Sequence, residues 1–164
     1  MKLLNAMGMI GLLLLAAGCG QSEPVDFKDG ATLEKPLTPI RWLTNYEEAL
    51  NEARVQNRQV LLVFTGLDWS EPCQKLQDQV LLTPEFADYS AENLILVKVD
   101  FPMHVRQPPQ MVAHHKALFQ NLELEEFPAM VLLNSDGVEV ARLETTVPDE
   151  FKSFRAWFES VEEP

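Results

Sequence analysis

Two cysteines, Cys19 and Cys73, carry the most distinctive chemistry in this 164-residue sequence. Cys73 closes the run Trp-Ser-Glu-Pro-Cys at residues 69–73, and Ser70 is a residue type that favours the start of a helix. A thiolate at a helix start attacks disulfides, and a second thiol three residues away resolves the product. Ser70 stands three residues before Cys73, and a hydroxyl neither forms a stable alkoxide near neutral pH nor makes a disulfide. The run therefore offers one thiol where dithiol exchange requires two.

The three histidines of the chain favour solvated or half-buried positions over a metal site. His114 and His115 are adjacent, so on a helix they point in different directions. A weaker hypothesis is a metal-handling protein in which Met103, His104 and Cys73 contribute to a copper site. The sequence shows no glycine-rich phosphate loop, no Ser-His-Asp arrangement and no paired-carboxylate site. We therefore expect no metal and no cofactor.

Hydrophobic periodicity predicts a regular order of helices and strands from about residue 40 to 161. The apolar runs predict strands over 59–65, 93–100, 129–133 and 138–143, the last two joined by a hairpin turn. Helical spacing predicts helices over 44–57, 70–80, 83–89, 108–122 and 148–161. A capping box of Thr44 and Glu47 is expected to begin the first helix. The order predicts an α/β fold with a mixed central sheet and helices on both faces.

This order and three short motifs resemble the thioredoxin-like family. The segment Phe-Thr-Gly-Leu-Asp-Trp at 64–69 is similar to the Phe-Thr-Gly-Ser-Asp-Trp-Cys signature of a bacterial subgroup of exported thioredoxin-like proteins. Glu-Phe-Pro at 126–128 precedes a predicted strand, where the family places a cis-proline. Asn-Ser-Asp-Gly at 134–137 is similar to the family's Asp-x-x-Gly hairpin. The resemblance covers roughly residues 40–161 and implies a thioredoxin fold with a degenerate Trp-Ser-x-x-Cys site.

The resemblance assigns a role to each residue of this site. Ser70 replaces the nucleophilic cysteine of redox-active members, and Cys73 occupies the resolving position, which is more buried and less reactive. Trp69, Phe127 and Pro128 are expected to line a groove in which an extended peptide pairs with the backbone. Such a groove would survive the loss of the first cysteine.

A second departure from the family concerns proton transfer. Redox-active thioredoxins commonly carry a buried carboxylate immediately before the aromatic residue that matches Phe64. This sequence has Val63 at that position. The resemblance thus implies that dithiol chemistry has been abandoned, because both the nucleophile and the acid are absent.

The N-terminus predicts export and anchoring to a membrane. Residues 1–18 combine a positive start, a short apolar run and small residues, which is typical of a signal peptide. Residues 15–19 (Leu-Ala-Ala-Gly-Cys) resemble a bacterial lipobox, which implies lipidation of Cys19. Residues 19–40 are polar and proline-containing, so we expect a lipidated N-terminus and tether there and a thioredoxin-like domain over 41–164.

Charge narrows the classes of partner. The net charge of −12 disfavours nucleic acid and anionic head groups, so membrane attachment is expected through the lipid anchor alone. We expect a lipid-anchored, redox-impaired binding module of the cell envelope that engages a protein or peptide partner and faces the periplasm or the cell exterior. The alternative is a single-cysteine thiol-disulfide oxidoreductase acting through Cys73, with a second protein resolving its mixed disulfides.

Overall fold

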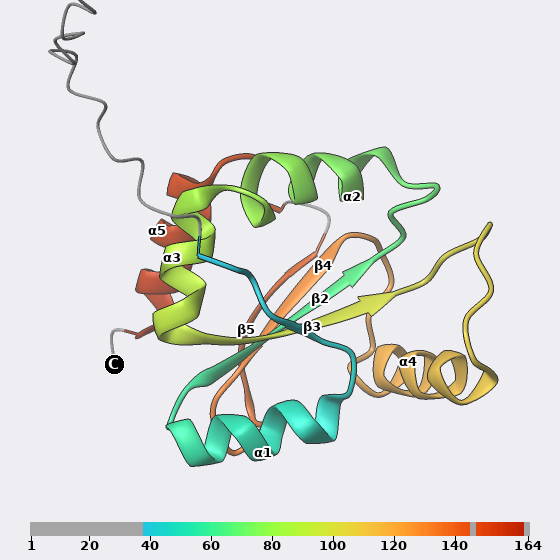
Figure 1. The fold of residues 1–164 in the computed structure, drawn as a ribbon, viewed down its shortest axis with the longest axis horizontal. Helices are drawn as coiled ribbons and strands as arrows, with labels where there is room; N and C mark the ends of the chain where they lie inside the picture. The colour runs from blue at the N-terminus through green and yellow to red at the C-terminus, as the bar shows by residue number, and fades with distance from the viewer. Residues whose placement is uncertain (1–37, 145–146, 163–164) are drawn as a thin grey trace, which may run out of the picture. The chain divides into compact units, whose positions relative to one another are not determined.

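The computed structural model describes residues 38–144 and 147–162, so the predicted signal peptide, Cys19 and nearly all of the predicted tether lie outside the described residues. A five-stranded sheet in the order β1-β3-β2-β4-β5 forms the centre of the fold (Figure 1). The strands are β1 (Trp42–Leu43), β2 (Gln59–Thr65), β3 (Leu94–Asp100), β4 (Ala129–Leu133) and β5 (Glu139–Glu144). β1, β3 and β2 are parallel, β4 is antiparallel to β2, and β5 is antiparallel to β4. The predicted mixed sheet is confirmed.

Helices cover both faces of the sheet, as predicted (Figure 1). One face packs against α1 (Tyr46–Gln56) and α4 (Pro109–Asn121). The other packs against α2 (Glu71–Leu76), α3 (Pro84–Asn93) and α5 (Phe151–Glu162). α2 continues directly into a π-helical turn over Gln77–Leu81.

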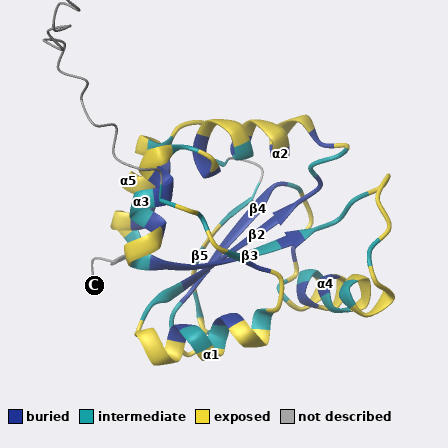
Figure 2. Cartoon of the chain, in the orientation of Figure 1, coloured by how far each residue is buried: buried dark blue, intermediate teal, exposed yellow. Residues whose placement is uncertain are grey.

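Strand β2 shows why two layers of helices are needed. Successive side chains of a strand point to opposite faces of the sheet. Val60, Leu62 and Phe64 join the apolar cluster beneath α1 and α4, whereas Leu61 and Val63 join the cluster beneath α2, α3 and α5. The strand is therefore buried almost throughout, and it carries the chain into the centre of the candidate site at its carboxyl end (Figure 2).

Three local features differ from the expectation. The cap of α1 is Asn45, whose side chain accepts the Glu48 N–H at 3.1 Å, so the capping box of Thr44 and Glu47 is wrong. Asparagine caps a helix better than threonine. Strand β1 was missed because two residues show no periodicity, and the π-helical turn was missed because helical spacing was assumed to be uniform. Within the described ranges, no helix is both long and apolar enough to cross a bilayer.

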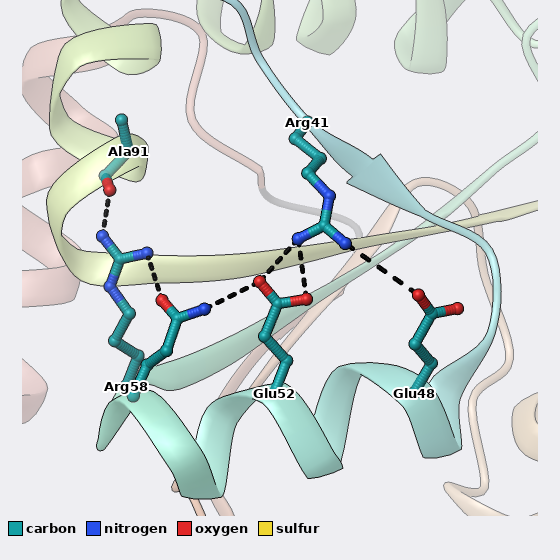
Figure 3. A network of polar contacts seen from close by, with 6 residues as sticks. Arg41, Glu48, Glu52, Arg58 and Ala91 are labelled. Carbon is teal, nitrogen blue, oxygen red and sulfur yellow. Dashed lines mark hydrogen bonds and ion pairs between the residues drawn. The ribbon is translucent and has the colours of Figure 1, made fainter.

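A polar network holds the start of the folded chain to two helices (Figure 3). Arg41, next to β1, donates to both carboxylate oxygens of Glu52 in α1, at 2.5 and 2.7 Å. Gln56 donates to Glu52 and accepts from Arg58, which in turn donates to the backbone oxygen of Ala91 in α3. These residues line a pocket of about 300 Å³ and tie the edge strand to α1 and α3.

Candidate functional site

Ser70 is the N-cap of α2. Its backbone is extended, with φ of −106° and ψ of 110°, and its Oγ accepts the backbone N–H of Cys73 at 3.4 Å. The bond satisfies one of the N–H groups that a helix start leaves without an intrahelical partner. Ser70 is 6% exposed. Its hydroxyl oxygen therefore engages the helix start and is largely screened from solvent.

Cys73 is the third residue of α2 and is 1% exposed. The backbone N–H of Gly66 donates to its Sγ at 3.4 Å. The oxygen of Gly66 accepts the N–H groups of Trp69 and Ser70, at 3.2 and 2.8 Å, so residues 66–70 form a tight turn beside the sulfur. Gln74 closes the turn from the helix by donating to the oxygen of Leu67 at 2.8 Å. The thiol is thus enclosed by the turn before it and the helix that contains it.

The side chain of Trp69 packs over the same turn. Its indole Nε1–H donates to the backbone oxygen of Phe101 at 2.7 Å, and 38% of the residue remains exposed. A Cβ on Gly66 would lie 2.2 Å from a carbon of the indole ring, a distance that real contacts do not reach. Only glycine therefore fits under Trp69 in this arrangement.

Phe127 and Pro128 come just before β4, the strand next to β2, and meet Trp69 at the edge of the sheet where β2 ends. The peptide bond between Phe127 and Pro128 is cis. The Phe127 ring contacts Trp69 edge-on at a centroid distance of 5.6 Å and packs on Phe101 and Phe119 at 5.1 and 4.9 Å. Among the described residues, the backbone N–H and oxygen of Phe127 have no hydrogen-bond partner. The structure therefore brings together the three residues that were expected to line a groove.

Asp68 joins the site loop to the loop that follows β3, a role that the sequence did not indicate. Its carboxylate accepts the N–H of Met103 at 3.0 Å and that of His104 at 2.6 Å, and His104 Nδ1 lies 3.2 Å away. These donors, led by the His104 N–H, lower the pKa of the Asp68 carboxyl. Asp68 belongs to the motif at 64–69, but its partners are 35 and 36 residues away, so spacing could not reveal them.

The histidines occupy three different environments. His104 is exposed and His114 is partly exposed, as expected, but His115 is only 2% exposed, so its solvated or half-buried placement was wrong. His115 Nδ1 donates to the backbone oxygen of Asp100 at 3.0 Å, because a carbonyl can only accept, and the ring packs against Phe101. In the part of the chain that the structure describes, no three His, Cys, Asp or Glu residues group as a metal site would need.

Val63 lies in the apolar cluster beneath α2, where the resemblance implied a carboxylate in redox-active members. It is 1% exposed and shares this cluster with Leu76 and Val80 from the region that follows Cys73. An unpaired carboxylate in such surroundings would be strongly disfavoured in its charged form. The residues around the thiol therefore supply packing and no titratable group from this position.

The parallel β1-β3-β2 arrangement, the antiparallel β4 and β5, the helix start at the end of β2 and the cis-proline opposite it define a thioredoxin-like protein. The thioredoxin-like family matches residues 41–135, and the chain belongs to this family.

Two relatives from Chlamydia pneumoniae are similar over most of the chain. The chain is 29% identical to the disulfide bond reductase DsbH over 142 residues, which are 85% of this chain and 85% of that protein. It is 27% identical to the thioredoxin-related protein DsbJ over 140 residues, which are 85% of this chain but 38% of DsbJ.

Solved structures agree on the fold. The structure called DsbH oxidoreductase superposes with a TM-score of 0.68 at 27% identity and covers 77% of this chain and 88% of its own. A thioredoxin from Thermus thermophilus superposes with a TM-score of 0.57 at 24% identity, over 74% and 86% of the two chains, and so supports the fold alone.

Proposed function

We propose that this chain is a redox-impaired, thioredoxin-like binding module of the cell envelope, anchored by a lipid on Cys19. It engages a protein or peptide partner through the groove lined by Trp69, Phe127 and Pro128. The proposed domains are a signal peptide over 1–18, a lipidated tether over 19–40 and the thioredoxin-like domain over 41–164.

The proposal of a redox-impaired site is supported by one observation, the arrangement of Ser70 and Cys73 at the start of α2. The position before the helix holds a hydroxyl whose oxygen caps α2, and the remaining thiol is 1% exposed. An attacking sulfur must reach the disulfide of its substrate, and the enclosed Sγ of Cys73 offers no such access. Neither residue is therefore placed to begin an exchange.

The proposal that a peptide binds in the groove is supported by Trp69 and Phe127. Their rings are in edge-on contact, and Trp69 keeps a partly exposed apolar surface. The N–H and oxygen of Phe127 find no partner within the described part of the chain, and in our proposal they pair with the backbone of an extended segment. Backbone pairing beside aromatic side chains is a recurrent way to bind a peptide.

A second candidate function is favoured by the relatives. One is named a disulfide bond reductase and another a thioredoxin-related protein. On this alternative, Cys73 acts as the single cysteine of a thiol-disulfide oxidoreductase and forms a mixed disulfide that a second protein resolves. The site must then open, because the sulfur is enclosed in the structure.

Alkylation of Cys73 separates the two. The full-length protein is treated with iodoacetamide near neutral pH, with and without urea, and modification of the Cys73 peptide is followed by mass spectrometry. We expect modification only in urea. Rapid modification of the folded protein would contradict the binding module and favour the oxidoreductase.

A further inference from the structure

Residues 101–122 differ in charge from the rest of the chain. They contain no aspartate or glutamate, although the whole chain has 25 acidic residues and a net charge of −12. They carry Arg106 and Lys116, and they hold all three histidines. This segment forms the loop after β3 and helix α4, so acidic side chains reach it from other elements and not from its own sequence.

The cations of this segment are exposed and have no partner among the described residues. Arg106 and Lys116 form neither an ion pair nor a hydrogen bond there. Some other cations pair with carboxylates, as Arg41 does with Glu52 and Arg155 with Glu159, whereas Arg54 and Lys152 form no such pair among the described residues. In a strongly acidic protein, two free cations on one segment leave a local positive charge for an outside group.

Apolar side chains accompany these cations. Met103 is 70% exposed, Val105 is 64% exposed and Val112 is 47% exposed. Figure 2 shows that the tip of the loop after β3 is exposed. Interfaces between proteins are depleted of acidic residues and lysine at their centre and enriched in methionine and arginine. Met103, Val105, Arg106, Val112 and Lys116 are here called the loop–helix surface. Its apolar side chains and Arg106 fit this composition, whereas Lys116 does not.

The loop is held in place before any partner arrives. Asp68 accepts two of its N–H groups, and Gln107 at its end donates to the oxygen of Asp100 at 3.2 Å. Pro102 and Pro108 restrict the backbone near either end. A preorganised loop loses less conformational entropy on binding, so its exposed apolar side chains are effective contacts.

Helix α4 links the residues Val112 and Lys116 of the loop–helix surface to the aromatic residues of the groove. Val112, Lys116 and Phe119 follow one another at spacings of four and three residues, so they form one stripe along α4. Phe119, at the end of this stripe, packs on Phe127 with a centroid distance of 4.9 Å. A segment leaving the groove at Phe127 therefore meets the stripe directly.

We propose that the loop–helix surface binds an acidic segment of the partner protein, with apolar side chains that pack on Met103, Val105 and Val112. The inference rests on the proposed function, because it extends the groove at Phe127. Carboxylates border the surface: Asp68 accepts the N–H groups of Met103 and His104, and Glu47 lies 3.6 Å from His114. A narrow acidic segment is attracted here and repelled elsewhere, which fixes its position. An extended anionic lipid surface would meet the bordering carboxylates as well, so a peptide segment is the better fit.

Three fluorescent peptides test the proposal on the full-length protein in detergent micelles. They share alternating leucines and carry glutamate, glutamine or lysine between them, and binding is followed by fluorescence anisotropy. The double variant R106E/K116E reverses the charge of the surface. R54E/K152E is the matched control, because Arg54 and Lys152 are also exposed, lie outside the surface and change the net charge equally.

We expect the glutamate peptide to bind more tightly than the lysine peptide, and R106E/K116E to weaken its binding about tenfold while R54E/K152E leaves it unchanged. Equal effects of the two variants would overturn the proposal, as would no binding of the glutamate peptide up to about 1 mM. So would an unchanged peptide affinity in R106E/K116E if, in the Cys19→Ser background, R106E/K116E also weakened binding of the protein to phosphatidylglycerol vesicles, which would assign the surface to lipid.

The groove is tested separately with Trp69→Ala. Weaker binding of all three peptides in Trp69→Ala, with no effect of R106E/K116E, would support the groove and overturn the loop–helix surface. The opposite pattern would support the surface and contradict the groove. The two proposals therefore fail independently.

Discussion

The Oγ of Ser70 accepts the backbone N–H of Cys73 at 3.4 Å, so the residue that replaces the family's attacking cysteine serves as a helix cap. The bond joins the two positions between which a redox-active site would form its disulfide. The remaining thiol is 1% exposed, which supports the redox-impaired site that we propose.

Restoring the missing thiol tests how much of the site survives. We expect Ser70→Cys to gain measurable reduction of insulin disulfides, because Cys73 already stands at the resolving position and the helix start is intact. The gain is expected to be modest, since Val63 supplies no proton-transfer group. The turbidity of reduced insulin measures this gain in activity, with Ser70→Ala as the control. Ser70→Ala should stay inactive, and the loss of the helix cap should lower its stability by about 1 kcal/mol. An inactive Ser70→Cys variant that folds normally would contradict a preserved redox scaffold.

Gly66 and Trp69 form a steric pair. We expect Gly66→Ala to lower the free energy of unfolding by about 1–3 kcal/mol, because the new Cβ would lie 2.2 Å from the indole ring. Urea denaturation measures the change. In the Trp69→Ala background the same substitution should have much less effect, since the ring that it meets is gone. An equal loss in both backgrounds would show that the indole is not the cause.

The stability that the Asp68 carboxylate contributes by holding the loop after β3 should depend on pH. Its folded-state pKa is lowered from 3.8, chiefly by the N–H of His104, so its stabilisation is present above that value and is lost as the pH falls below it. We expect Asp68→Asn to lower the midpoint of urea unfolding at pH 6. The difference in midpoint from wild type should shrink as the pH drops below about 3.8. Glu71→Gln is the control, because Glu71 forms only an exposed pair with Lys75 and should change little. A difference that stays constant down to the lowest pH would argue against the carboxylate.

Lipidation of Cys19 is a prediction on residues outside the described part of the chain. We expect the chain to incorporate an alkyne-labelled fatty acid and to fractionate with membranes when produced in a bacterial host. Cys19→Ser should lose both properties, because acyl chains are the proposed attachment. Cys73→Ser, the matched cysteine control, should retain both. Labelling that persists in Cys19→Ser would rule out this anchor.

The sequence by itself was sufficient for most of the secondary structure and for the fold. The strand over 59–65 and that over 129–133 were predicted with the bounds that the structure shows, because both are apolar runs between clear turn signals. Ser70 was recognised as a cap from residue type alone, and Trp69, Phe127 and Pro128 were expected together because the family's motifs occur in the right order. This information lies in the local spacing of residues and in the order of motifs that the sequence shares with the family.

Only the tertiary structure showed what surrounds these residues. The hydrogen bonds from Met103 and His104 to Asp68 join segments that lie far apart in the chain. The close contact of Trp69 with Gly66 and the burial of His115 depend on how densely the chain packs. Periodicity indicates which face of an element is apolar, but it does not indicate which distant loop reaches that face. The missing cysteine was evident in the sequence, whereas the enclosure of the cysteine that remains follows from the turn at Gly66, because burial is a property of the packed chain.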